Sequence, residues 1–313
     1  MLALRLWLLL LVEMTLYSLG GIVLWRQTDI ASGWLFILAI GVAFALRAAV
    51  VLLTFFLSGL NSIDRPHHIR IAGSAALRLF LAEYFALLAL YSWFQPLEKC
   101  LRRESGENEA GVAIPVLFIH GFLCNGGFWW SLRRYLTARG CHGLYWLNLE
   151  PLFGDIERFA KQIHLRIEAI CDAVGAEQVI LVGHSMGGLA ARAYLRNWGD
   201  RNRVAKLVTL GTPHHGTALG RFLKGANVSQ MRRLNPWLGD LNETAMGATP
   251  TVSIYSYHDN IVAPQDSPRL TYGENIPLAG IGHLEMAFSK RIAEFVCREI
   301  VDVRQTGRLT IVC

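Results

Sequence analysis

Charged residues are scarce in this chain. Asp, Glu, Lys and Arg make up 17% of its 313 residues, whereas 53% are hydrophobic. An ordinary soluble domain carries about 25% charged residues. The deficit therefore argues against a purely soluble protein and favours segments that lie in a membrane.

Cysteines are also few, and none of the six lies in a C-x-x-C pair or at another metal-ligand spacing. This excludes a cysteine-based metal site, and we expect no metal ion. Cys171 and Cys297 fall in predicted helices, where a small buried hydrophobe is the usual role of cysteine. The thiols are expected to be mostly reduced, and one disulfide bond is the alternative.

Zinc-finger, basic-zipper and RNA-binding patterns are absent as well. The net charge is nevertheless +6. In so apolar a chain, a basic balance indicates contact with anionic lipid headgroups rather than with nucleic acid. We expect membrane lipids as partners and no nucleic acid, and the oligomeric state stays open.

Three apolar runs occupy the N-terminal third of the chain: Leu2–Trp25, Gly33–Leu60 and Ala75–Phe94. Each is long enough to cross a bilayer core, which needs about 20 residues. The first run differs from a signal peptide because it carries Glu13 and lacks a clean basic start and a convincing cleavage site. We predict a membrane domain with three transmembrane helices over residues 1–97. The alternative is one or two spans with an amphipathic hairpin on the membrane surface.

Few charges interrupt these runs. A charge in mid-membrane is costly and is usually paired. We therefore predict that Arg47 pairs with Glu13, with Glu83 or with both inside the helical bundle. The alternative is that both glutamates lie shallow enough to reach the lipid headgroups.

The distribution of basic residues does not indicate which ends of the predicted spans face the cytoplasm. Arg65 and Arg70 precede the third run, and Lys99, Arg102 and Arg103 follow it, so the positive-inside signal nearly cancels. We predict a multi-pass protein of a cell membrane, and specifically of a bacterial inner membrane. The side of the membrane on which the catalytic domain lies stays open. The charged, glycine-containing stretch 98–111 is interpreted as a linker.

Strands alternate with helices over residues 112–313. Buried apolar runs predict strands, and an apolar period of about 3.6 residues predicts helices. This alternation predicts an α/β domain whose mostly parallel sheet is covered on both faces, with its site at the carboxyl ends of the strands. The predicted strands are 113–119, 143–149, 178–182, 204–210, 251–257 and 276–279, and the predicted helices are 128–139, 156–174, 189–196 and 284–301.

The stretch from Gly183 to Gly187 reads G-H-S-M-G, which matches G-x-S-x-G between a predicted strand and a predicted helix. Such a nucleophile elbow holds a serine hydroxyl in the open beside a base. Its glycines let neighbouring backbone approach closely, and the N-terminus of the next helix favours developing negative charge. Ser185 is therefore the predicted nucleophile.

A serine nucleophile needs a histidine as base and a carboxylate to orient it, in the order serine, acid, histidine for this fold. His283 lies in a glycine-rich loop between the last predicted strand and the terminal helix. Asp259 follows the preceding strand. We predict a Ser185–Asp259–His283 triad. Weaker alternatives are His214, His215 and His258 for the base, and Asp266 and Asp240 for the acid.

An oxyanion hole requires two backbone amides beside the nucleophile. The amide after the nucleophile belongs to Met186. The second should come from the loop that follows the first strand of the domain, and we predict Phe122, with Leu123 as the alternative donor. Backbone donors tolerate any side chain, so the residue types themselves carry no information.

Residues 217–246 form the longest stretch between predicted strands and mix apolar with basic side chains. We interpret this stretch as a short amphipathic lid over an acyl-chain pocket, whose cations contact lipid headgroups. An ordinary packed insertion is the alternative. The candidate substrate-binding residues are Leu123, Trp129, Phe222 and Trp237, and core packing explains Trp129 equally well.

Five motifs together resemble the bacterial true-lipase group of α/β-hydrolases. They are Val116–Phe122, Gly183–Gly188, Val208–Gly216, Ser253–Asp259 and Gly280–His283. The resemblance covers residues 114–300 and implies ester hydrolysis on acyl lipids without a metal or an organic cofactor. The G-T-P-H-x-G stretch is also similar to that of lipases acting on membrane-anchored lipids. The N-terminal membrane region departs from the group, whose members are typically secreted.

The sequence thus predicts a membrane-anchored serine esterase or lipase, phospholipases included, that works through an acyl-enzyme. An acyltransferase with the same triad is one alternative, and a non-catalytic membrane scaffold is another. A dehalogenase is disfavoured because its chemistry needs a carboxylate at position 185.

Overall fold

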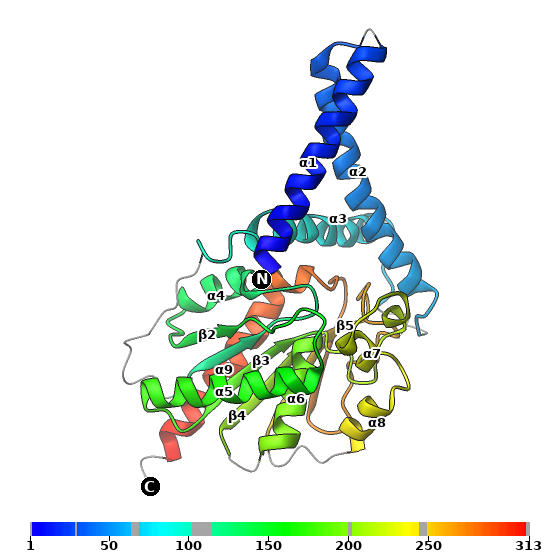
Figure 1. Cartoon of the computed structure of the whole chain (residues 1–313). Helices are drawn as coiled ribbons and strands as arrows, with labels where there is room; N and C mark the ends of the chain where they lie inside the picture. The colour runs from blue at the N-terminus through cyan, green and yellow to red at the C-terminus, as the bar shows by residue number, and fades with distance from the viewer. Residues whose placement is uncertain are drawn as a thin grey trace.

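A computed structural model describes residues 2–28, 30–63, 69–101, 114–199, 202–243 and 249–310. A helical part formed by the first hundred residues stands on an α/β domain formed by the rest (Figure 1). Most of the predicted linker, residues 102–111, lies outside the described residues. Its first residue, Glu98, is buried and accepts a hydrogen bond from Trp146 Nε1 at 3.0 Å.

Within the described residues, six parallel strands form one sheet in the order β2-β1-β3-β4-β5-β6. The central strands β1 and β3 are buried along their whole length, as expected for a parallel sheet covered on both faces. All six predicted strands are present with small shifts of their ends. They are β1 Val116–Ile119, β2 Leu144–Leu147, β3 Val179–His184, β4 Val204–Leu210, β5 Thr251–Ser256 and β6 Glu274–Leu278.

Helices cover both faces of the sheet and complete two apolar cores. α5 (Ile156–Val174) and α6 (Met186–Trp198) pack on one face, and α4 (Trp130–Thr137) and α9 (Lys290–Thr310) pack on the other. The predicted stripe of α5 faces its core, because a 3.6-residue period places these residues on one side of the helix. The buried residues of this stripe are Ile156, Phe159, Ile163, Ile167 and Ile170.

The terminal helix begins later than predicted. Residue 284 is its expected start, but α9 begins at Lys290 and a short 3-10 turn, η6 (Glu285–Ala287), precedes it. The backbone amides of Leu284 and Glu285 instead donate to the side chain of Glu83, 201 and 202 residues away. A distant carboxylate therefore holds the segment that local periodicity assigned to helix.

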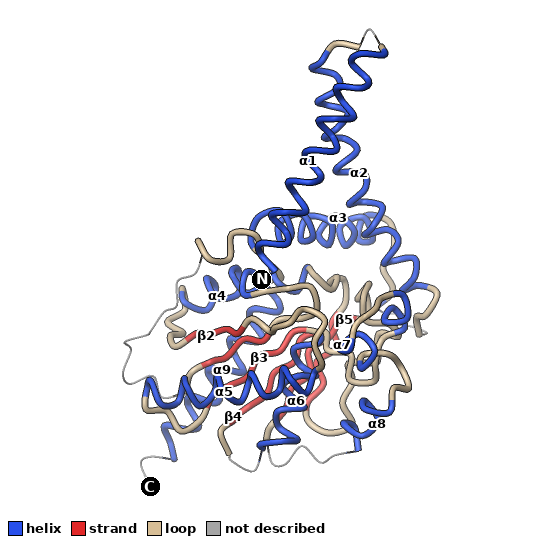
Figure 2. Tube along the Cα trace, viewed as in Figure 1, coloured by secondary structure: helices blue, strands red, loops and turns tan. Residues whose placement is uncertain are grey.

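The helical part contains a long hairpin and one helix of different orientation. α1 (Leu2–Gln27) and α2 (Ser32–Gly59) form the hairpin that projects away from the sheet (Figure 2). α3 (Ser74–Ala89) runs across the top of the α/β domain and continues into a π-helical turn, η2 (Leu90–Phe94). The segments Leu2–Gln27, Ser32–Gly59 and Ser74–Phe94 are all long and apolar enough to cross a membrane.

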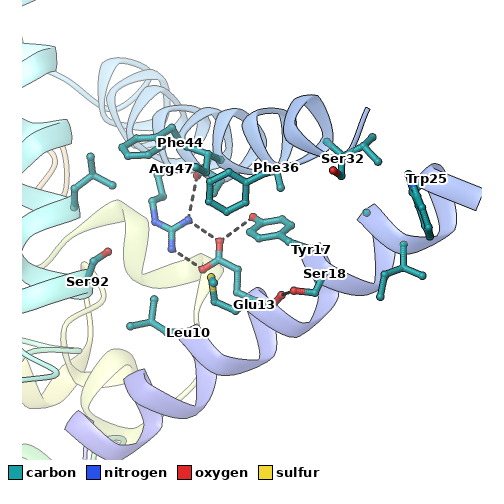
Figure 3. A pocket seen from close by; sticks show the side chains of 18 residues that line it. Leu10, Glu13, Tyr17, Ser18, Trp25, Ser32, Phe36, Phe44, Arg47 and Ser92 are labelled. Carbon is teal, nitrogen blue, oxygen red and sulfur yellow. Dashed lines mark hydrogen bonds and ion pairs between the residues drawn. The ribbon is translucent and has the colours of Figure 1, made fainter. Parts of the chain in front are cut away.

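The predicted pairing of Arg47 is confirmed with Glu13 and is wrong for Glu83. Arg47 Nη1 and Nη2 donate to the two carboxylate oxygens of Glu13 at 2.7 and 2.6 Å, and Tyr17 donates to the same carboxylate at 2.8 Å (Figure 3). These groups line a cavity of about 750 Å³ between α1 and α2 that is otherwise mostly apolar. The ion pair is therefore bidentate and joins the two arms of the hairpin.

Replacing Arg47 by Gln should leave the Glu13 carboxylate without its cation. A charge that loses its partner in apolar surroundings destabilises the fold, here by about 2 kcal/mol because the pair is partly exposed. The melting temperature in detergent should fall for Arg47→Gln and recover most of the way in the double variant with Glu13→Gln. An unchanged melting temperature in the single variant would contradict a stabilising pair.

Candidate active site

Ser185 lies at a sharp turn between β3 and α6. Its backbone has φ 53° and ψ −124°, a conformation that non-glycine residues rarely adopt. Close packing holds this turn: a Cβ on Gly183 would lie 2.7 Å from Gly188 Cα, and one on Gly187 would collide with the carbonyl of Ile119. The predicted elbow geometry is confirmed, and its glycines are required by close approach of backbone.

Asp259 and His283 come together at the same edge of the sheet, after β5 and β6 respectively. Their side chains form a hydrogen bond of 2.7 Å between Asp259 Oδ2 and His283 Nδ1. Asp259 Oδ1 accepts the amides of Ile261 and Val262, both at 2.8 Å. Each carboxylate oxygen thus has a fixed partner, and Nε2 is left as the ring nitrogen of His283 that can act on a proton.

His184, the residue directly before Ser185, contacts His283. The rings of His184 and His283 have centroids 4.6 Å apart, and His184 Nε2 lies 3.3 Å from the carbonyl of His283. Among the described residues, Ser185 Oγ forms no hydrogen bond with His283. Such contacts are commonly long before substrate binds, so this geometry remains compatible with a base acting on Ser185.

The two adjacent histidines have opposite electrostatic settings. Burial opposes protonation of His283, but the facing Asp259 carboxylate outweighs it and raises the pKa of His283 above its ordinary value. Burial, together with the nearby His283, lowers the pKa of His184 well below its ordinary value. His184 therefore stays neutral, whereas His283 can hold a proton.

The alternative residues occupy other positions. His214 is buried, and its ring nitrogens bond to Thr209 Oγ1 and Arg192 Nη1. His215 Nε2 bonds to the carbonyl of Arg269, and His258 Nδ1 accepts the amide of Gly280. Asp240 and Asp266 are exposed. Of these candidates, the structure brings together only Asp259 and His283 as an acid–base pair.

The loop after β1 lies directly beside the elbow, as predicted for an oxyanion hole. A Cβ on Gly121 would lie 2.9 Å from Ser185 Cβ. The amides of Phe122 and Leu123 follow on this loop, and Leu123 has a strained φ of 56°. Met186 is the first residue of α6, so its amide has no partner within the helix. The loop that carries Phe122 and the first residue of α6 therefore both lie next to Ser185, and the role of their amides stays a prediction.

The four candidate substrate residues have different settings. Leu123 is half-buried on the loop beside the elbow, and Phe222 is 54% exposed. Trp237 Nε1 donates to Glu157 of α5 at 2.7 Å, so its ring packs against the domain. Trp129 is fully buried against Phe118, which favours its core role over a place in a pocket.

The predicted lid is partly packed into the domain. It contains η5 (Ala218–Phe222), α7 (Ala226–Gln230) and α8 (Pro236–Glu243), while residues 244–246 lie outside the described residues. Val228, Met231, Leu238 and Leu241 belong to the core on the α5–α6 face. Asn227 Nδ2 of α7 lies 3.3 Å from Met186 Sδ, so this segment reaches the elbow.

Sequence reasoning missed Asn260 as a member of the site. Its Oδ1 accepts the backbone amide of His283 at 3.0 Å, which ties the acid loop to the base loop. The only available signal was its position directly after Asp259.

The described residues contain no group of three or more His, Cys, Asp and Glu side chains that could hold a metal ion.

The parallel sheet with helices on both faces defines the class of fold: the chain carries an α/β-hydrolase fold, similar to that of lipases and esterases. The Palmitoyl protein thioesterase family matches residues 115–238, which include the elbow. The mature lipase BlEst2 of Bacillus licheniformis superposes with a TM-score of 0.54 at 17% identity, over 62% of this chain and 94% of that one.

Two relatives are similar in sequence. A triacylglycerol lipase of Burkholderia plantarii is 25% identical over 57% of this chain and 52% of its own length. A triacylglycerol lipase of Pseudarthrobacter phenanthrenivorans is 26% identical over 55% of this chain and 57% of its own length. The chain therefore spans about half the length of these relatives.

A fluorophosphonate probe should label Ser185 at a rate that depends on neutral His283. Because the pKa of His283 is raised above 6.5, the labelling rate should fall as the pH drops through a value above 6.5. Asp259→Asn removes the carboxylate that raises this pKa, so the acidic limb of the pH profile of labelling should move to lower pH. The maximal labelling rate should also fall about 10⁴-fold, because the imidazole loses the group that orients it.

The exposed Asp266 provides the matched control, and Asp266→Asn should leave both the limb and the rate unchanged. A labelling rate that stays constant between about pH 5 and pH 9 would argue against His283 as the base.

Proposed function

We propose that this protein is a membrane-anchored serine carboxylic-ester hydrolase that acts on acyl lipids. The observation that carries the proposal is the position of Ser185 at a strained elbow, on the sheet edge where Asp259 and His283 are hydrogen-bonded at 2.7 Å. The lipase relatives and the lipase fold support the same reaction type.

The reaction proceeds through an acyl-enzyme. Ser185 Oγ attacks the acyl carbonyl carbon while His283 Nε2 takes the hydroxyl proton. The amides of Met186 and Phe122 donate to the oxyanion. His283 returns the proton to the leaving alcohol, and a water molecule, activated by the same base, releases the acid. Asp259 orients the imidazole and stabilises its protonated form.

The α1–α2 hairpin is the membrane anchor in this proposal. Most of its large apolar side chains are exposed, including Leu9, Leu11, Phe36 and Phe56 at more than half of their surface. A 26-residue helix is about 39 Å long, which exceeds the bilayer core of about 30 Å. α3 lies along the α/β domain (Figure 1), so the two bilayer spans of this proposal are α1 and α2, which differs from the three spans expected from the sequence.

The substrate would reach the site beside the lid. Phe222 and Leu223 are 54% and 48% exposed, and η5, which contains Phe222, lies against α2. Phe153, also 48% exposed, lies next to Gly225 of the same segment. An exposed apolar patch next to the membrane anchor suits entry of an acyl chain from the bilayer.

Replacing Ser185 by Ala removes the nucleophile and should reduce hydrolysis of a p-nitrophenyl acyl ester by about three orders of magnitude or more. The variant should keep the wild-type melting temperature, because alanine retains the Cβ and leaves the backbone of the elbow unchanged. Product analysis with competing alcohols would separate hydrolysis from acyl transfer. Turnover at the wild-type rate in the Ser185→Ala protein would rule the mechanism out.

Phe222→Asp should lower hydrolysis of esters embedded in vesicles while hydrolysis of a short soluble ester is retained. A charge in the patch weakens contact with apolar chains, and the expected loss on vesicles is about 10-fold. Leu165→Asp, at a position on α5 with 58% exposure, is the matched control. Equal losses on both substrates would contradict a role of the patch in lipid access.

A further inference from the structure

The loops that carry the predicted acid, base and oxyanion donors all rest on the N-terminal helical part. These loops have little regular secondary structure of their own, and each is hydrogen-bonded to a residue before position 100. The contacts bridge 30 to more than 200 positions of sequence. The lipase resemblance does not cover this part of the chain.

The base loop is held by α3. Glu83 has no exposed surface, and its carboxylate accepts the amide of Leu284 at 3.0 Å and that of Glu285 at 2.9 Å. A Cβ on Gly282 would collide with this carboxylate, so the loop lies directly against it. His283 is thus flanked on both sides by residues that touch Glu83.

A second contact from α3 secures the same loop further upstream. Arg78 Nη2 donates to the carbonyl of Gly280 at 3.2 Å. A buried carboxylate is costly unless it is hydrogen-bonded, and here two backbone amides satisfy it. Removal of the Glu83 carboxylate would leave these buried backbone amides without an acceptor, which costs more free energy than the hydrogen bonds contribute when they are formed.

The acid loop is held by the end of α2. Ser58 Oγ donates to the carbonyl of Asp259 at 2.9 Å and accepts Gln265 Nε2 at 2.8 Å. Thr54 Oγ1 accepts Asn260 Nδ2 at 2.8 Å, and Asn260 in turn accepts the amide of His283. α2 is thereby connected to both members of the acid–base pair.

The oxyanion loop is held by the residue that follows η2. Gln95 Oε1 accepts the amide of Asn125 at 2.9 Å, and the Gln95 carbonyl accepts Asn125 Nδ2 at 2.9 Å. A Cβ on Gly127 would collide with the carbonyl of Phe94. The helical part therefore contacts all three loops around Ser185.

We propose that α2 and α3 are positioning elements of the active site, with Ser58 aligning Asp259 and Glu83 aligning His283. The inference rests on the proposed esterase function. A base must be held within about 0.5 Å of its productive position, and a misplacement of about 1 Å costs on the order of 10² in rate. Glu83 and Ser58 act through the loops and do not touch substrate.

The test compares kcat, KM and the pH profile of full-length variants in detergent, with a soluble p-nitrophenyl ester. Glu83→Gln places an amide NH₂ against a backbone N–H, so one hydrogen bond is lost. We expect kcat to fall about 10- to 100-fold with KM within about 2-fold. Ser58→Ala should lower kcat about 3- to 10-fold by the same route.

The pH profile separates positioning from a merely structural role. Glu83 and His283 are electrostatically coupled, and burial opposes ionisation of Glu83 in the same pH range, so removal of Glu83 should change the shape of the acidic limb of the kcat/KM profile. Ser58→Ala should leave the limb in place. The charged and titratable groups around His283 are Asp259, His184, Glu83, Glu285 and Arg78.

Matched controls come from the hairpin. Glu13→Gln, measured below its melting temperature, neutralises a glutamate of the same region, and Ser18→Ala removes a hydroxyl that bonds only within α1. Both should keep the wild-type kcat and limb. If Glu83→Gln unfolds, Ser58→Ala decides the outcome alone.

Wild-type kcat in folded Ser58→Ala and Glu83→Gln proteins, alongside turnover that depends on Ser185, would overturn this inference and leave the esterase function intact. An absence of Ser185-dependent turnover in the wild-type protein would overturn both.

Discussion

Ser185 can keep its left-handed backbone only because glycines let β1, β3 and α6 approach each other at the elbow. Gly183 meets Gly188, Gly187 meets the Ile119 carbonyl, and Gly121 meets Ser185 itself. The amide of Ser185 donates to the carbonyl of Leu210 at 2.9 Å, which ties the turn to β4 as well. Ser185, the proposed nucleophile, is therefore held by closely packed backbone from β1, β3, β4 and α6.

The partners of Ser185 are placed differently. Asp259 and His283 lie on loops that are hydrogen-bonded to α2 and α3 as well as to the sheet, where the His283 carbonyl lies 3.3 Å from His184 Nε2. Ser185 thus lies on closely packed backbone, whereas the loops of Asp259 and His283 contact the apolar helices. The apolar helices and the proposed active site therefore form one packed unit.

Much of the site could be predicted because its signals are local. The elbow is a five-residue pattern at a strand-to-helix turn, and His283 and Asp259 follow strands in the order the fold requires. The pairing of Arg47 with Glu13 was predictable because two opposite charges in apolar helices must find a partner. Glu83 carried the same signal and was one of the two possible partners of Arg47, but its hydrogen bonds go to the backbone amides of Leu284 and Glu285, which have no sequence signature.

The sequence by itself determined the sheet strands, the elbow, the triad order and the apolar helices, because periodicity and short motifs reflect local backbone preferences. The tertiary structure decided that Trp129 lies in the core, that α9 starts at Lys290 and that α3 lies across the α/β domain. These features depend on contacts between residues far apart in the chain, such as Glu83 with Leu284 and Ser58 with Asp259. Only the packed fold brings such residues together.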